Sequence, residues 1–282
     1  MRFLLGLIMV LAAPAAARAA QPFEIVPDVV YGHKDGMALT FDVLRPKQGS
    51  NGAAVLYMVS GGWVSPYVPP EKFVVVATPL LNAGFTVFFV RHGSSPRYVI
   101  PEIVEDVRRA VRFVRLHAKQ YDLDPDRLGV MGQSAGGHLS LVLGTTADAG
   151  NPKAKDETLR ASDRVAAVVA YFPPTDVRPW VDPSSKYYQN YPALRFDAAK
   201  AGDYSPRLHV TADDPPTLLV TGDKDTLVPM EHSEKIRVQF QEKHVPCDLM
   251  IIPGAGHGFQ GDDAKQASDA TVAWFKKYLL QQ

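Results

Sequence analysis

Hydrophobic residues along this chain follow two patterns. Short continuous runs of aliphatic, β-branched and aromatic residues, typical of buried strands, occupy 53–59, 85–90, 128–131, 165–172, 217–221 and 248–252. Between most of these runs, apolar residues recur at helical spacing in 70–83, 101–118, 135–146, 231–243 and 264–280. Strands that alternate with helices predict an α/β fold, in which a mostly parallel central sheet carries helices on both faces.

Two segments depart from this alternation. Near the start, the apolar runs 29–32 and 38–44 flank Asp35-Gly36, and Asp-Gly between such runs is typical of an antiparallel hairpin. The segment 173–216 is rich in prolines and lacks clear periodicity. Long segments of this kind are often functional, so we expect an irregular cap insertion above the sheet. Substrate contact there is favoured by its aromatic residues and the tyrosine just before it: Tyr171, Trp180, Tyr187, Tyr188 and Tyr191.

The first residues have the pattern of an export signal. Arg2 is followed by an apolar run, 3–13, that is too short to span a bilayer comfortably, and Ala17-Arg18-Ala19 resembles a signal-peptidase site. The alternatives are a membrane anchor or a buried helix. We expect residues 1–19 to be a secretory signal peptide and 20–282 to form one domain. The mature protein would then be periplasmic or secreted, without stable membrane insertion.

Composition narrows the possible partners and chemistry. Thirty Lys and Arg residues balance thirty Asp and Glu residues in a chain of 282, and no basic run is present, which argues against a nucleic-acid partner. Cys247 is the only cysteine, so an internal disulfide is excluded and a packing role is expected for it. No His-Glu-x-x-His or comparable spacing occurs, and we therefore expect no catalytic metal.

The strongest chemical motif is Gly132-Gln133-Ser134-Ala135-Gly136, which lies between a predicted strand and a predicted helix. Strand, sharp turn and helix around a Gly-x-Ser-x-Gly string form a nucleophile elbow, which lifts the serine hydroxyl above the sheet edge. The alternative is an ordinary tight turn with glycines for close packing. We interpret Ser134 as a catalytic nucleophile.

A serine nucleophile requires a base and an acid that orients the base, and both should follow strands at the same sheet edge. His257 lies in the glycine-rich segment after 248–252, and the loop after 217–221 offers Asp223 and Asp225. We assign Asp225, which lies further along the loop, as the acid and give Asp223 a turn-stabilising role. Of the other histidines, His138 is expected to be a packed helix residue, while His92 follows a strand and is a further candidate for lining the site.

Stabilising the oxyanion requires fixed backbone donors. One is expected at Ala135, directly after the nucleophile, and the other at Gly62 or Trp63 in the loop Ser60-Gly61-Gly62-Trp63. The alternative for that loop is a plain tight turn. Aromatic residues near the expected site make Trp63, Trp180 and Phe259 candidate pocket walls, with ordinary packing as the alternative.

Taken together, these motifs resemble the α/β-hydrolase superfamily. The elbow 132–138, the segment 124–128 and the loop 222–229 look like the branch that contains acetyl esterases, bifunctional acetylxylan/feruloyl esterases and the catalytic domain of prolyl oligopeptidases. The resemblance implies an α/β-hydrolase fold, the second aspartate of Gly222-Asp223-Lys224-Asp225 as the acid, and no cofactor. One departure is Ser60, which replaces the histidine of that family's usual His-Gly-Gly oxyanion loop.

The sequence therefore predicts a secreted serine esterase that uses Ser134, His257 and Asp225. Its expected substrates are short-chain acyl esters or cell-wall esters carrying acetyl or feruloyl groups, either as small molecules or linked to a polysaccharide. Two alternatives remain at this point: a serine peptidase of the prolyl oligopeptidase type, and a non-catalytic binding protein on a hydrolase scaffold. The sequence leaves the oligomeric state open.

Overall fold

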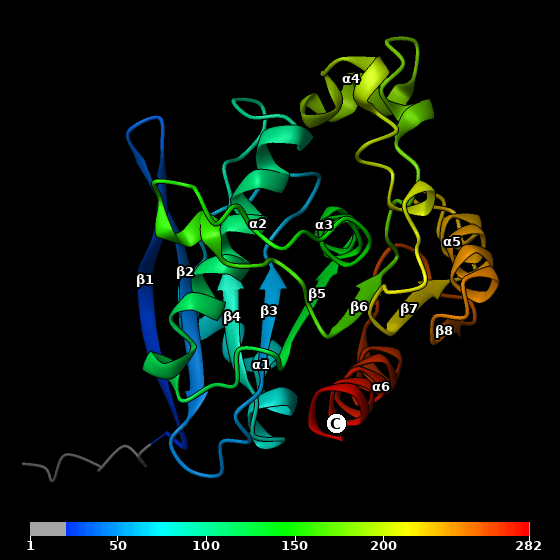
Figure 1. Ribbon diagram of the computed structural model, residues 1–282. Coiled ribbons are helices and arrows are strands. Elements are labelled where there is room, and N and C mark those ends of the chain that lie inside the picture. Colours follow the sequence, from blue (N-terminus) through cyan, green and yellow to red (C-terminus); the bar gives the residue numbers. More distant parts are fainter. Residues whose placement is uncertain (1–20, 282) are drawn as a thin grey trace, which may run out of the picture.

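A single eight-stranded sheet forms the centre of the molecule (Figure 1). The computed structural model describes residues 21–281, so the predicted signal peptide lies outside the described residues. The spatial order of the strands is β1-β2-β4-β3-β5-β6-β7-β8. Their bounds are β1 (Phe23–Lys34), β2 (Met37–Pro46), β3 (Ala54–Met58), β4 (Thr86–Val90), β5 (Leu128–Gln133), β6 (Ala167–Tyr171), β7 (Thr217–Gly222) and β8 (Cys247–Ile252).

The sheet is antiparallel only at its N-terminal edge. β1 and β2 form the hairpin expected around Asp35-Gly36, and β2 pairs antiparallel with β4. Every neighbouring pair from β4 to β8 is parallel. The carboxyl ends of five parallel strands therefore lie along one edge, where α/β proteins bind their ligands.

Helices cover both faces of the sheet and enclose two hydrophobic cores. On one face, α1 (Val74–Asn82) and α6 (Gly261–Leu280) pack against side chains of β4, β5 and β7. On the other face, α2 (Ile100–Leu116), α3 (Ala135–Thr145) and α5 (Glu231–Glu242) bury their apolar residues. The predicted fold class, a mostly parallel sheet with helices on both faces and an N-terminal hairpin, is confirmed.

The segment between β6 and β7 contains only short helices, among them α4 (Lys186–Asn190), and lies beyond the carboxyl edge of the strands (Figure 1). Buried polar groups organise it. The hydroxyl of Ser205 accepts a hydrogen bond from the Val177 amide at 3.0 Å and donates to the Ala201 carbonyl at 2.8 Å. Asp176 forms ion pairs with Arg178 and Arg207. Specific contacts thus fix this segment even though it lacks long helices or strands.

Candidate active site

Ser134 stands at the sharp turn between β5 and α3. Its backbone is in an unusual conformation, with φ 53° and ψ −117°, and its amide donates to the Tyr171 carbonyl at 2.9 Å. The turn needs its flanking glycines because a Cβ on Gly132 would lie 2.4 Å from the backbone of Gly136. A strained residue held by close backbone packing is typical of functional sites. The turn presents the Ser134 hydroxyl to a cavity at the carboxyl edge of the sheet.

The structure brings Ser134, His257 and Asp225 together in one hydrogen-bonded chain. His257 Nε2 lies 2.9 Å from Ser134 Oγ, and His257 Nδ1 lies 2.7 Å from Asp225 Oδ2. A carboxylate only accepts hydrogen bonds, so the contact with Asp225 places the proton on Nδ1 and leaves Nε2 free to accept the serine proton. Such an arrangement can activate a hydroxyl for nucleophilic attack.

The two candidate aspartates have different neighbours. Asp225 is 6% exposed, and its Oδ1 accepts the amides of Leu227 and Val228, each at 2.9 Å. Asp223 Oδ1 instead accepts the Gly254 amide at 2.6 Å, which ties the loop after β7 to the loop that carries His257. Asp223 therefore joins the two loops, and Asp225 is the aspartate that contacts the histidine.

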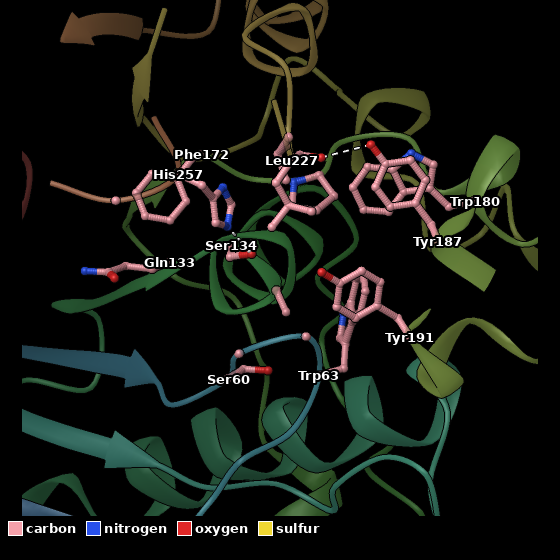
Figure 2. A pocket seen from close by; sticks show the side chains of 16 residues that line it. Ser60, Trp63, Gln133, Ser134, Phe172, Trp180, Tyr187, Tyr191, Leu227 and His257 are labelled. Carbon is pink, nitrogen blue, oxygen red and sulfur yellow. Dashed lines mark hydrogen bonds between the residues drawn. The ribbon is translucent and has the colours of Figure 1, made fainter. Parts of the chain in front are cut away.

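The loop 60–63 faces Ser134 across the cavity (Figure 2). Gly62 and Trp63 both have left-handed backbones, with φ 55° and 61°. In the part of the chain that the structure describes, the amides of Gly62, Trp63 and Ala135 donate no hydrogen bond to another protein group. Three unused amides around one cavity beside a serine hydroxyl provide what an oxyanion site requires.

A buried histidine holds the side chain of Trp63. The indole Nε1 lies 3.2 Å from His138 Nδ1, and His138 Nε2 lies 2.8 Å from the carbonyl of Tyr204. Since a carbonyl only accepts, Nε2 carries the proton and Nδ1 accepts from the indole. Burial lowers the pKa of His138 to about 4, so the ring is neutral at pH 7. His138 is thus a packed helix residue, as expected, and it also fixes Trp63.

His92 lies behind the same loop, outside the cavity lining. Its Nδ1 is 2.8 Å from the Gly93 carbonyl and its Nε2 is 2.8 Å from Ser60 Oγ. By the same argument, Nδ1 donates to the carbonyl and the Ser60 hydroxyl donates to Nε2. Burial lowers the pKa of His92 to about 4. An imidazole from the loop after β4 therefore contacts Ser60, the residue that departs from the expected His-Gly-Gly loop.

Aromatic side chains form the far wall of the cavity, whose volume is about 350 Å³. Trp180 and Tyr187 stack with ring centroids 4.0 Å apart, and the Tyr187 hydroxyl donates to the Leu227 carbonyl at 3.0 Å (Figure 2). Tyr191 completes this wall at 6.1 Å from the Trp63 ring. The candidate wall residues Trp63 and Trp180 line the cavity.

Phe259 is the exception among the candidate wall residues. It does not line this cavity but packs against Tyr171 and Phe172 on the side of α6, because Phe172 stands between it and Ser134. Sequence reasoning also missed Phe172 and the pair Leu227 and Val228, which do line the cavity. Phe172 directly follows β6, and Leu227 and Val228 lie just beyond Asp225. These positions could have identified them as cavity residues, since residues that follow parallel strands meet at this edge.

Other chemistry-bearing groups lie apart from this cavity. Burial raises the pKa of the Cys247 thiol to about 12, which keeps it protonated at neutral pH. Within residues 21–281, no group of three His, Cys, Asp or Glu side chains is arranged to hold a metal ion. No helix in the same range is long and apolar enough to cross a membrane.

Known proteins resemble this chain in both sequence and structure. The chain is 27% identical over 259 residues to a probable carboxylic ester hydrolase, LipM, of Mycobacterium tuberculosis, covering 87% of this chain and 59% of LipM. It is also 27% identical over 282 residues to an ethyl acetate hydrolase of Pseudomonas putida, covering 91% of this chain and 83% of that protein. A solved acetyl ester-xyloside bifunctional hydrolase of Caldicellulosiruptor lactoaceticus superposes with a TM-score of 0.77 at 22% identity, covering 90% of this chain and 96% of that one.

The first of these relatives is longer than this chain, which spans about six-tenths of its length. A family model gives the most direct assignment. The model described as BD-FAE matches residues 41–240, a range that begins in β2 and includes Ser134, Asp225 and the loop 60–63. The chain has the fold of the α/β-hydrolases and belongs to the BD-FAE family.

Proposed function

We propose that this protein is a carboxylic ester hydrolase that works through a covalent acyl-enzyme on Ser134. The observation that carries the proposal is the hydrogen-bonded chain from Ser134 Oγ through His257 to Asp225, with distances of 2.9 Å and 2.7 Å. The carboxylic ester hydrolase and the ethyl acetate hydrolase among its relatives support the same reaction class. All three groups that such catalysis requires are present, which favours a catalyst over a binding protein.

The first half of the reaction acylates the serine. Ser134 Oγ attacks the ester carbonyl carbon while its proton moves to His257 Nε2. The Asp225 carboxylate stabilises the resulting imidazolium through Nδ1–H. The negative charge that forms on the carbonyl oxygen is stabilised by the Ala135 amide, at the positive end of α3, and by the amide of Gly62 or Trp63. Collapse of this intermediate breaks the ester C–O bond, and the leaving alcohol takes the proton from His257 Nε2.

The second half regenerates the enzyme. Water replaces the alcohol and gives a proton to His257 Nε2 as its oxygen attacks the acyl carbon. The same amides stabilise the second oxyanion. When the acyl–Oγ bond breaks, the proton returns to Ser134 and the carboxylic acid leaves. Every proton transfer therefore uses one nitrogen of one histidine, which explains why the orientation of His257 by Asp225 matters.

The proposed substrates are short-chain acyl esters and cell-wall esters that carry acetyl or feruloyl groups. The cavity of about 350 Å³ is lined mainly by aromatic and aliphatic side chains, with the polar groups gathered near Ser134. Stacked rings such as Trp180 and Tyr187 offer a flat face to a sugar or an aromatic acid. Feruloyl esters are therefore included in the proposed substrate class.

A substrate panel with one variant tests this function. We expect the wild-type protein to hydrolyse an aryl acetate and to be labelled on Ser134 by a fluorophosphonate. Ser134→Ala should lose about 10⁴-fold or more in kcat while keeping its melting temperature. Undiminished hydrolysis in Ser134→Ala would contradict the mechanism. Comparable turnover of a prolyl amide would instead favour a peptidase, and a folded wild type without turnover or labelling would favour a binding protein.

We also propose that residues 1–19 direct export and are removed. The motif Ala17-Arg18-Ala19 and the short apolar run before it support this location. N-terminal sequencing of protein recovered from the periplasm or medium should begin at residue 20. Recovery of the intact N-terminus from the cytoplasm would count against export and would leave the proposed chemistry unaffected.

A further inference from the structure

A second cavity, of about 360 Å³, lies beside the first and is bounded by α1 and α6. The two cavities share Gln133, Phe172 and Gly258. Gln133 and Gly258 are the immediate neighbours in sequence of Ser134 and His257, so the two cavities meet next to the reacting groups. In Figure 2, Gln133 and the aromatic wall lie on opposite sides of Ser134.

The wall between the two cavities is Phe172. Its φ of 35° is unusual for a residue with a side chain, and its amide donates to the Val220 carbonyl at 2.6 Å. The ring centroid lies 4.5 Å from that of His257 and 5.3 Å from that of Phe259. Such a strained conformation persists only where its surroundings impose it. The strain at Phe172 places an apolar ring between the two cavities.

Among residues 21–281, those that line the second cavity include no charged side chain. Its polar side chains are Gln133 and Ser268 near the surface and the hydrogen-bonded pair Tyr171 and Thr271. The Tyr171 hydroxyl lies 3.0 Å from the Ala267 carbonyl and 2.7 Å from Thr271 Oγ1. Burial raises the pKa of Tyr171 to about 12, so the phenol stays neutral. Aliphatic and aromatic side chains, among them Leu80 and Phe259, form most of the remaining surface. The cavity therefore fits an uncharged, apolar group.

The rim of this cavity is unusually apolar for a surface. Helix α1 contains no charged residue, and Val75 and Val76, which both line the cavity, are 81% and 45% exposed. Contiguous exposed apolar side chains mark places where a protein meets a ligand or partner. Because this patch continues into a cavity that opens beside Ser134, its expected occupant is part of the substrate.

We propose that the cavity between α1 and α6 is a second substrate subsite that takes an apolar chain or ring on one side of the scissile ester bond. The aromatic cavity takes the group on the other side of Ser134. The inference rests on the proposed ester hydrolysis and narrows its substrate class to esters with one substantial apolar group. That group is either the alcohol portion or the acyl portion, and both share the chemistry that the lining recognises.

A matched pair of variants tests the subsite. Val76→Asp adds a charge to the rim, and Val238→Asp is its control, because Val238 is 48% exposed on α5 and lies outside both cavity linings. Two substrate series are compared, acetates from methyl to hexyl and methyl esters from acetate to hexanoate. We expect Val76→Asp to lower kcat/KM about tenfold more for the long members of one series than for methyl acetate, and Val238→Asp to leave both series unchanged. The responding series identifies which portion of the ester enters.

A second pair of variants tests the effect of filling the cavity with a large side chain. Ser268→Trp points a large ring from α6 into the space that Ser268 lines, whereas Gln266→Trp, at an exposed position of the same helix, is the control. We expect only Ser268→Trp to remove the preference for long esters. If Val76→Asp matches Val238→Asp and Ser268→Trp matches Gln266→Trp in both series, the subsite is refuted. Failure of the wild type to hydrolyse methyl acetate and every other ester would refute the proposed function.

Discussion

The two sides of the aromatic cavity are held in place by different kinds of contact. The catalytic side consists of Ser134 and the loops 222–228 and 253–258, which follow parallel strands and are joined by hydrogen bonds to backbone amides, as at Asp223 and Asp225. The aromatic side consists of the loop 60–63 and the segment 172–194. Its aromatic side chains are held by ring stacking and by single polar contacts, such as Trp63 to His138. Sheet geometry thus positions Ser134, His257 and Asp225, whereas side-chain contacts position Trp63 and the aromatic wall.

The sharpest test of the catalytic side is a pair of substitutions in one loop. Asp225→Asn should lower kcat by about 10³- to 10⁴-fold, because an amide no longer orients His257 or stabilises its charged form. Asp223→Asn should change kcat far less and mainly lower the melting temperature, since it weakens the bond to the Gly254 amide. Steady-state kinetics with an aryl acetate and thermal unfolding of both variants provide the measurement. Equal losses of kcat in the two variants would show that the loop as a whole, and not Asp225 alone, carries the effect.

Acidification should act mainly through three histidines behind the aromatic side. Burial lowers the pKa of His92, His138 and His232 to about 4, whereas an unfolded histidine has a pKa of about 6.5. Between these values the unfolded chain binds protons that the folded chain does not, so the free energy of unfolding falls as the pH decreases. The slope is about 1.4 kcal/mol per pH unit for each such histidine.

Urea unfolding, followed by tryptophan fluorescence at about pH 7.5 and about pH 5, measures this loss. A variant such as His138→Gln should show a shallower dependence on pH than the wild type, whatever its stability at pH 7.5. Stability that rises on acidification across this range would contradict the neutral state of these three rings in the folded protein.

Ser60→Ala tests whether the imidazole behind the loop 60–63 positions the oxyanion donors. Loss of the hydroxyl leaves His92 Nε2 without its donor, and we expect kcat to fall about tenfold while KM for a small ester stays the same. If the Ser60 hydroxyl only stabilised the fold, Ser60→Ala would lower the melting temperature without this selective fall in kcat. In a double-mutant cycle with His92→Phe, the two effects on kcat should be strongly non-additive. Additive effects would mean that the two residues act separately.

The smallest expected effect concerns the link between the two sides. Tyr187→Phe removes the hydroxyl that donates to the Leu227 carbonyl while the ring keeps its stacking on Trp180. We expect about a fivefold rise in KM with little change in kcat, because one hydrogen bond is worth about 1 kcal/mol. Tyr188→Phe is the matched control, since Tyr188 lies outside the cavity lining. A large loss of kcat in Tyr187→Phe would show that the link also positions Asp225.

The same contrast explains what could be predicted from the sequence. The order of strands and helices, the elbow at Ser134 and the loops of Asp225 and His257 were predictable because hydrophobic periodicity and parallel pairing determine where those loops meet. The sequence predicted Phe259 as a pocket wall without indicating which cavity it lines; it packs against Phe172 and lines the second cavity. Contacts between side chains distant in sequence leave no periodic signal.

The contact between Ser60 and His92 could have been predicted from the sequence. These residues follow β3 and β4, which are neighbours in the sheet, so the loops after them are adjacent in space. A serine in the place of the expected histidine, with a histidine after the adjacent strand, was a readable combination. The pairing of Trp63 with His138 through the indole nitrogen could not be read in this way, because it depends on the left-handed turn at Trp63.

The backbone of Leu227 has a consequence for engineering. Its amide donates to Asp225, and its carbonyl accepts from Tyr187. In the segment between β6 and β7, which also contains Tyr187, the Tyr204 carbonyl accepts a hydrogen bond from His138, which holds Trp63. A chimera that exchanges this segment for that of a relative would therefore alter the acid loop and the oxyanion loop along with the binding wall. Grafts designed to change substrate range should keep both anchoring bonds, and directed evolution inside the segment should spare Tyr187 and the backbone at 204.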